Sequence, residues 1–112
     1  MPSDLASVLQ RLPEGWYASD EKKAQGFLAE LRKELPPGHL LFDKDVTVVA
    51  HRTGTDDILC RHINEPKRYT VIHLTWIMKQ ETDPQYPCVE VDGDFEDFLD
   101  YERSFLEANE TE

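Results

Sequence analysis

The first third of the chain repeats its apolar positions with the period of an α-helix, and this pattern predicts two helices. In residues 5–12 the apolar side chains fall at helical spacing until Pro13 interrupts them. A second helix is predicted to begin at Ser19 or Asp20, since either side chain can cap a helix N-terminus, and to continue to about Leu35. The sequence Pro-Pro-Gly follows and ends this helix.

The middle of the chain changes to the two-residue period of β-strands. Residues 46–52 and 57–63 flank a short loop that contains Gly54, so these two segments are predicted to form a hairpin. Residues 69–76 are a third predicted strand, because they are rich in β-branched and aromatic side chains. Residues 88–91 can add a short fourth strand. The pattern therefore predicts an antiparallel meander of three or four strands.

Strand alternation divides these segments between two faces of the sheet. The even-numbered positions form the more apolar face, with Val46, Val48, Ala50, Ile58, Cys60, Ile72, Leu74 and Trp76. We expect Trp76 to be largely buried on this face, beneath the helices. Its replacement by Ala would then cost on the order of 3–5 kcal/mol of stability.

A last helix is predicted to begin at Asp92 or Asp94, since either can cap it. Its apolar stripe consists of Phe95, Phe98, Leu99, Phe105 and Leu106. We expect this helix and the second one to cover the even-numbered face. The predicted fold is thus a single α+β domain over residues 1–112. It has two N-terminal helices, a three- or four-stranded antiparallel meander and one C-terminal helix, with the helices covering one face of the sheet.

Negative charge is concentrated at the C-terminal end of the chain. The formal net charge is −11, from 23 acidic residues against 12 Lys plus Arg. Residues 90–112 hold ten of the acids and one of the bases, which leaves the rest of the chain close to neutral. Such a surface repels phosphate backbones, so we expect no nucleic-acid partner and a basic protein as the possible partner. The alternative is that these charges only keep a helix face solvated.

The sequence also bears on where the protein works. No apolar run approaches the ~20 residues of a membrane span, so no membrane association is expected. The opening residues, Met-Pro-Ser-Asp, show neither the basic region nor the apolar stretch of a secretory signal, which favours the cytoplasm. In that compartment Cys60 and Cys88 are expected to be free, buried thiols rather than a disulfide.

The sequence predicts no cofactor and no metal. Cys60 and His62 share one strand face, but two ligands fall short of the three or four that zinc ordinarily requires. The segment from Asp92 to Asp94 matches a calcium loop only in part, because Asp97 stands where that loop requires glycine.

The odd-numbered face of the predicted sheet carries the candidate ligand-binding residues. They are His51, Asp57, Arg61, Tyr69 and His73. If the short loop after residue 52 sets the hairpin register, His51 lies opposite Asp57, and His73 lies beside Leu59. An Asp can orient a His for general-base chemistry, and Arg61 can hold an anion. The same residues can equally be ordinary polar side chains, whose cross-strand pairs stabilise a sheet by roughly 0.2–1 kcal/mol each.

The middle of the chain carries a short motif, His73-Leu74-Thr75-Trp76. Together with Gly38-His39 and Asp56-Asp57 before it, and Glu81, Pro84 and Pro87 after it, the motif resembles a family of small uncharacterised bacterial proteins. The likeness runs from about Gly38 to Phe98 and is weakest in the loop of residues 64–68. The resemblance implies a bacterial, cytosolic origin, and it implies no activity, cofactor or catalytic residue.

These observations favour one function and leave two alternatives open. The size, the absence of a catalytic motif and the acidic terminal helix favour a non-enzymatic protein-interaction module of the antitoxin or immunity kind. The first alternative is a small enzyme or ligand-binding domain that uses His51, Asp57, Arg61 and His73. The second is a homo-oligomer that associates through the odd-numbered face or through a strand edge.

Overall fold

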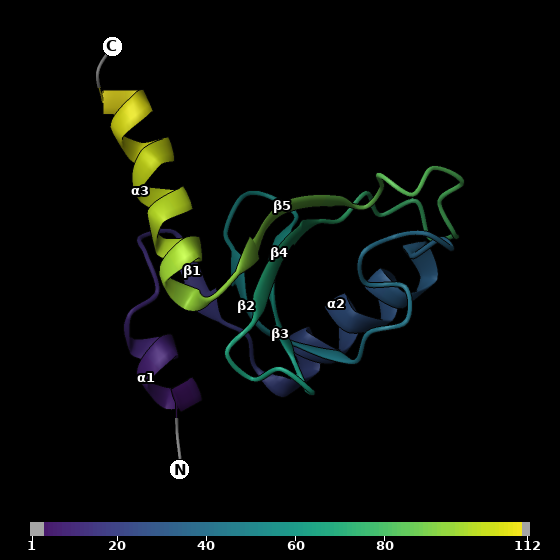
Figure 1. Ribbon diagram of the computed structural model, residues 1–112, viewed down its shortest axis with the longest axis horizontal. Helices are drawn as coiled ribbons and strands as arrows, with labels where there is room; N and C mark the ends of the chain where they lie inside the picture. The colour runs from purple at the N-terminus through teal and green to yellow at the C-terminus, as the bar shows by residue number, and fades with distance from the viewer. Residues whose placement is uncertain (1–3, 111–112) are drawn as a thin grey trace.

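The chain folds into a five-stranded antiparallel sheet with helices on both sides (Figure 1). The computed structural model describes residues 4–110, and the side chains of residues 5–104. In chain order the elements are α1 (Asp4–Gln10), β1 (Trp16–Ala18), α2 (Glu21–Glu34), β2 (Val46–Arg52), β3 (Asp57–His62), β4 (Tyr69–His73), β5 (Cys88–Gly93) and α3 (Phe95–Glu110). The strands lie in the order β1-β2-β3-β4-β5. The predicted α+β meander is confirmed, but it has five strands instead of three or four.

The extra strand is β1, which lies between the two N-terminal helices. It pairs with the end of β2, with Trp16 opposite Arg52 and Ala18 opposite Ala50. Three residues are too few to show the alternation that marks a strand in sequence. The side chain of Trp16 is buried, and its ring meets Phe98 of α3 edge-on at a centroid distance of 5.1 Å.

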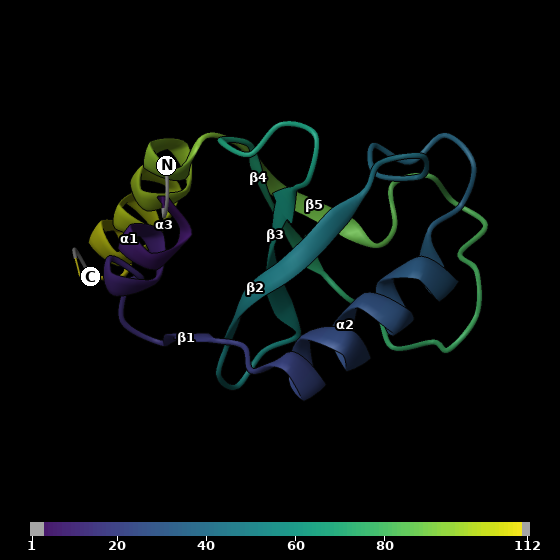
Figure 2. The same cartoon turned by 90° about the horizontal axis from the view of Figure 1, so that it is seen from below.

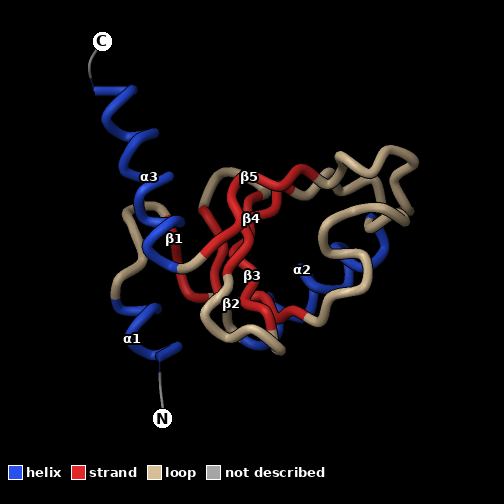
Figure 3. Tube along the Cα trace, in the orientation of Figure 1, coloured by secondary structure: helices blue, strands red, loops and turns tan. Residues whose placement is uncertain are grey.

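Helices cover both faces of the sheet, so the prediction that they cover one face is wrong (Figures 2 and 3). One core cluster joins the even-numbered face to α2, with Leu31, Leu35, Leu41, Val46, Val48, Ile58, Cys60, Ile72 and Leu74. The other joins the odd-numbered face to α1 and α3, with Val8, Trp16, Val49, Ala50, Leu59, Tyr69, Val71, Phe95 and Phe98. The apolar residues Val49, Leu59 and Val71 require a cover. Because α1 and α3 bury them, this face is not available for the predicted self-association.

The capping side chains set the starts of the two long helices, as predicted. The carboxylate of Asp20 accepts a hydrogen bond from the backbone N–H of Lys23 at 2.8 Å, and α2 ends at its C-cap, Leu35. Asp94 accepts from the N–H of Asp97 at 2.9 Å, while the Asp97 carboxylate accepts from the N–H of Asp94 at 3.0 Å. This reciprocal pair fixes the first turn of α3. The side chains of residues 105 and 106, in the predicted apolar stripe, lie outside the described range.

Two β-bulges redirect side chains within the sheet. In β2 the register shifts between Val48 and Ala50, and both Val49 and Ala50 belong to the core on the α3 side. The residues after this bulge therefore exchange faces, so that His51 turns toward α2. Arg52 turns toward α3, where its guanidinium lies 3.5 Å from the buried carboxylate of Glu102. A second shift lies between Val71 and Ile72 of β4, whose partners on β5 are Val91 and Val89, which leaves Glu90 as the extra residue.

The predicted burial of Trp76 is wrong. Strand β4 ends at His73, and Trp76 lies three residues beyond it with 39% of its surface exposed. Its backbone has a positive φ of 55°, in the left-handed region and outside the β region of an extended strand. Leu74 does keep its predicted place in the core on the α2 side. The alternation thus holds as far as Leu74, one residue past the strand, and fails at Trp76.

The two cysteines form no disulfide with each other. Cys60 and Cys88 are free cysteines, as predicted, although Cys88 is only half-buried. Burial raises the pKa of the Cys60 thiol to about 12. Within residues 4–110 no helix combines the length and the apolar character needed to cross a membrane.

Candidate functional site

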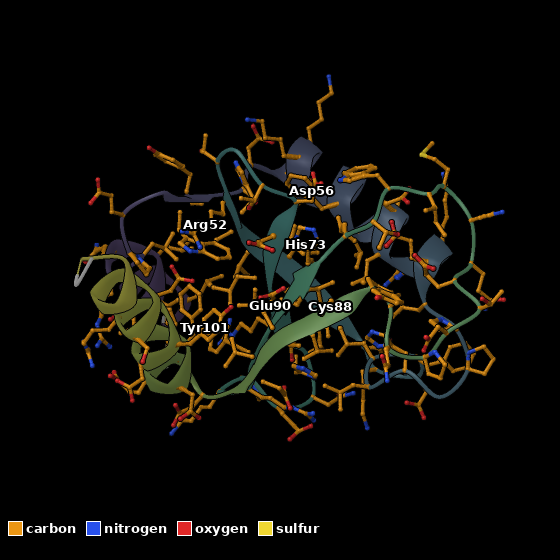
Figure 4. The ribbon with its side chains drawn as sticks, turned by 90° about the horizontal axis from the view of Figure 1, so that it is seen from above. Arg52, Asp56, His73, Cys88, Glu90 and Tyr101 are labelled. Atoms are coloured by element: carbon orange, nitrogen blue, oxygen red, sulfur yellow. The ribbon has the colours of Figure 1, made fainter. Side chains whose placement is uncertain are left out.

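Polar side chains gather on the α3 side of the sheet, at the end where β3 begins and β4 ends. We call Asp57, His73, Glu90 and Tyr101 the polar cluster. Asp57 is the first residue of β3 and lies directly opposite His73, the last residue of β4. The neighbouring strand β5 supplies Glu90, and α3 supplies Tyr101. Figure 4 shows His73, Glu90 and Cys88 close together on the sheet, with Tyr101 on the side of α3 that faces the sheet.

Asp57 and His73 form the closest pair of the cluster. His73 Nδ1 lies 2.8 Å from Asp57 Oδ1, and the nitrogen must be the donor because an ionised carboxylate only accepts. This hydrogen bond raises the pKa of His73 above its ordinary value. The hydroxyl of Thr55 donates to the other oxygen of the Asp57 carboxylate at 3.1 Å and fixes its orientation. The pair is therefore an ordered imidazole–carboxylate unit, with His73 half-exposed to solvent.

The bulge in β5 brings Glu90 into the polar cluster. The Tyr101 hydroxyl donates a hydrogen bond to Glu90 Oε1 at 2.7 Å. Burial, and then this hydrogen bond, raise the pKa of Tyr101 to about 12, so the phenol stays protonated and remains a donor. Asp57, His73 and Glu90 each offer one ligand atom, and these three atoms lie within 4.8 Å of one another. Two carboxylates and one imidazole at this separation can hold a cation or exchange a proton.

Of the five residues predicted from sequence, the structure brings only Asp57 and His73 into the polar cluster. The predicted register is wrong, because the bulge in β2 places His51 opposite Ile58. His51 instead lies on the α2 side, where its Nδ1 is 2.8 Å from Ser19 Oγ and its ring centroid 5.3 Å from that of Phe27. Burial lowers its pKa.

Arg61 and Tyr69 pair with each other at the far end of the β3–β4 ladder. The Arg61 Nε donates to the backbone oxygen of Pro66 at 2.9 Å, and the buried ring of Tyr69 packs on Phe95. Arg61 lies four positions along the strand from Asp57, a distance of about 13 Å. The site expected from His51, Asp57, Arg61 and His73 is therefore not assembled. Glu90 was missed because a bulge leaves no mark in an alternating pattern.

A second feature is an exposed apolar loop that begins three residues after His73 and lies on the α2 side of the sheet. We use the term apolar loop for Trp76, Ile77 and Met78, whose exposed fractions are 39%, 38% and 61%. Both Trp76 and Met78 have positive φ angles, of 55° and 67°. Non-glycine residues in this region are strained, at a cost of order 1–3 kcal/mol each, and such strain is concentrated at functional sites. The ring of Trp76 lies against Phe27 of α2 at a centroid distance of 6.4 Å.

Two buried carboxylates of α2 hold the apolar loop in this shape. Glu34 accepts hydrogen bonds from the backbone N–H of Thr75 at 3.0 Å and from that of Trp76 at 2.8 Å. Glu30 accepts from the N–H of Met78 at 3.0 Å. Both side chains are almost completely buried. Burial, and then a hydrogen bond with Glu30, raise the pKa of Glu34 to about 7.

Comparisons with known proteins add no relative. No protein-family model, no curated protein and no solved structure matches the chain. The resemblance of the His-Leu-Thr-Trp motif to a bacterial family stays a prediction, and the function has to be argued from the geometry of the polar cluster and the apolar loop.

Proposed function

We propose that this protein is a non-enzymatic protein-binding module of the antitoxin or immunity kind, and that the apolar loop is its contact with the partner. The observation that carries the proposal is that the side chains of the apolar loop are exposed while its backbone is held in place. Trp76, Ile77 and Met78 are exposed, while two buried carboxylates fix the backbone beneath them in a strained conformation. A folded core gains nothing from such an arrangement, whereas a contact surface does.

The composition of the apolar loop suits protein recognition. Trp is among the residues that contribute most to binding when a partner pocket buries them, and Met adapts to irregular apolar surfaces. Ordering a flexible loop on association costs binding free energy, and a loop that is already ordered avoids most of this cost. The hydrogen bonds that Glu30 and Glu34 accept from the loop backbone supply that order before the partner arrives.

The partner in this proposal is a basic protein with an apolar pocket. The chain carries a formal net charge of −11, and its acid-rich segment includes all of α3. Figure 1 places α3 on the side of the sheet opposite α2 and the apolar loop, so its charge acts through the long-range field rather than by contact. Such a field accelerates the encounter with a cationic partner and weakens as salt rises. A bacterial cytoplasmic setting is part of the proposal.

Affinity capture with a matched control tests the proposal. The tagged protein is incubated with extract of its source cells at low and at high salt, and the bound proteins are identified by mass spectrometry. The loop variant carries Trp76→Ser and Met78→Ser; the control carries Tyr17→Ser and Phe42→Ser, two exposed residues outside the loop. We expect a basic protein that binds the wild type and the control, is lost from the loop variant and is recovered less at high salt. The proposal fails if no captured protein distinguishes the loop variant from the control.

A further inference from the structure

The polar cluster has the composition and spacing of a metal site, and this is independent of the apolar loop. Its three ligand atoms come from adjacent strands and lie within 4.8 Å of one another. Zinc with ligand distances of ~2.0–2.1 Å needs tetrahedral ligand atoms to be about 3.3 Å apart. His73 and Glu90 are both partly exposed, so small rotations of these side chains can close the remaining gap without disturbing the core.

Two side chains that are not ligands hydrogen-bond to the ligand carboxylates, as outer-shell residues do in metal centres. The Thr55 hydroxyl holds one oxygen of Asp57, and the Tyr101 hydroxyl holds one oxygen of Glu90. Metal-binding carboxylates are typically held in this way, and the loss of such a partner weakens metal binding by about 10- to 100-fold. Each carboxylate is therefore anchored through one oxygen, which restrains its position and still allows a small rotation.

The charges around His73 also favour a cation. The carboxylates of Asp57, Glu90 and Asp56 all act electrostatically on this one imidazole. Bringing carboxylates together is unfavourable unless a positive charge lies between them. A divalent ion bound among these groups would supply that positive charge.

We propose that Asp57, His73 and Glu90 bind a divalent transition-metal ion, the class for which Zn²⁺ is the natural probe. An imidazole with two carboxylates suits Zn²⁺, Mn²⁺ or Fe²⁺, whereas Ca²⁺ and Mg²⁺ prefer sites made entirely of oxygen. Three protein ligands leave at least one coordination position for water or for a ligand atom from another molecule. Tyr101 is a positioning residue in this site and does not touch the ion.

Isothermal titration of the metal-free protein with ZnCl₂, MnCl₂, CaCl₂ and MgCl₂ tests the proposal. We expect one Zn²⁺ per chain, bound at least tenfold more tightly than Ca²⁺ or Mg²⁺. Glu90→Gln and His73→Ala should each weaken Zn²⁺ binding at least tenfold. Tyr101→Phe, which removes only the partner of Glu90, should weaken it about tenfold, less than the loss of either ligand. In ¹H–¹⁵N spectra, Zn²⁺ should shift the signals of residues 57, 73 and 90 most.

Three control variants separate this site from other zinc ligands. His51→Gln removes a histidine on the opposite side of the sheet, and Asp100→Asn removes an exposed acid of α3. Cys88→Ser removes the thiol that lies opposite His73 in the register. All three should bind Zn²⁺ like the wild type. Circular dichroism checks folding, and Glu90→Gln keeps the test decisive if His73→Ala fails to fold. The proposal is overturned by no saturable Zn²⁺ binding, by binding that survives Glu90→Gln, by loss only in Cys88→Ser, or by equal affinity for Ca²⁺.

Discussion

Glu34 shows how one buried side chain can determine the local chain path. The run from Val71 to Trp76 has the composition of a strand, and propensity alone continues it to Trp76. The Glu34 carboxylate instead accepts hydrogen bonds from the backbone N–H groups of Thr75 and Trp76. In a longer strand these N–H groups would be available for pairing within the sheet. A carboxylate bonded to two N–H groups outweighs a difference in strand propensity of at most ~1 kcal/mol. Sequence reasoning could not place Glu34, because the position in α2 looks like any polar helix position.

The raised pKa of Glu34 predicts how stability changes with pH. Burial and the hydrogen bond with Glu30 bring this pKa from an ordinary 4.5 to about 7 in the folded protein. Between these values the folded state holds a proton that the unfolded chain has lost, so the free energy of unfolding decreases as pH rises. The contribution of Glu34 is therefore complete below pH 4.5 and is lost as pH rises through about 7. Its size is on the order of a few kcal/mol.

Urea denaturation of wild type and Glu34→Gln, at pH values from about 4.5 to about 7.5, measures this contribution. Gln has no proton to lose, so the stability of wild type relative to Glu34→Gln should decline as pH rises. Acids other than Glu30, the hydrogen-bond partner of Glu34, titrate in both proteins and cancel in the difference. Two pH profiles that run parallel would show that Glu34 ionises normally.

At the scale of the elements, the periodicity of the sequence predicted the helices and most strands. It did not predict the two β-bulges, each of which changes the face on which the following side chains lie. The capping residues and apolar stripes of α2 and α3 predicted where both helices begin, because local hydrogen bonds to the capping side chains determine the helix starts. The bulge in β2 was not predictable, since two neighbouring apolar residues, Val49 and Ala50, are equally compatible with a regular strand that has a core on each side. This bulge moves His51 to the α2 side, and the bulge in β5 adds Glu90 to the polar cluster. Of the candidate site, the sequence could therefore identify Asp57 and His73 alone.

The two-sided packing of the sheet predicts which aromatic residue carries stability. Phe98 of α3 is fully buried against Trp16 and Phe95, so Phe98→Ala leaves a cavity and should cost on the order of 3–5 kcal/mol. Trp76 is partly exposed, and Trp76→Ala should cost distinctly less. Urea denaturation of the two variants compares them directly. If Trp76→Ala were the more damaging change, the apolar loop would belong to the core and could not be a contact surface.

At the scale of the whole molecule, the two candidate sites use different parts of one framework. The polar cluster lies between the sheet and α3, and the apolar loop rests on α2 beyond the opposite face (Figures 1 and 4). Only Leu74 and Thr75 lie between His73 of the polar cluster and Trp76 of the apolar loop. The Trp76 ring nevertheless packs on Phe27 of α2, while His73 pairs with Asp57 on the α3 side, so a side-chain change in the loop that keeps its backbone in place should leave metal binding intact. Neither arrangement follows from composition or net charge, because both depend on which helix covers which face.

The protein holds its apolar loop in one conformation before any partner is present. Backbone ¹⁵N relaxation of the isolated protein measures this directly. We expect order parameters for the amides of residues 75–78 near the ~0.85 of rigid backbone, equal to those of β3 and β4, and a marked decrease in Glu34→Ala. Values below ~0.6 in the wild type would describe a flexible loop, and would contradict both the role of Glu30 and Glu34 and the proposed contact surface.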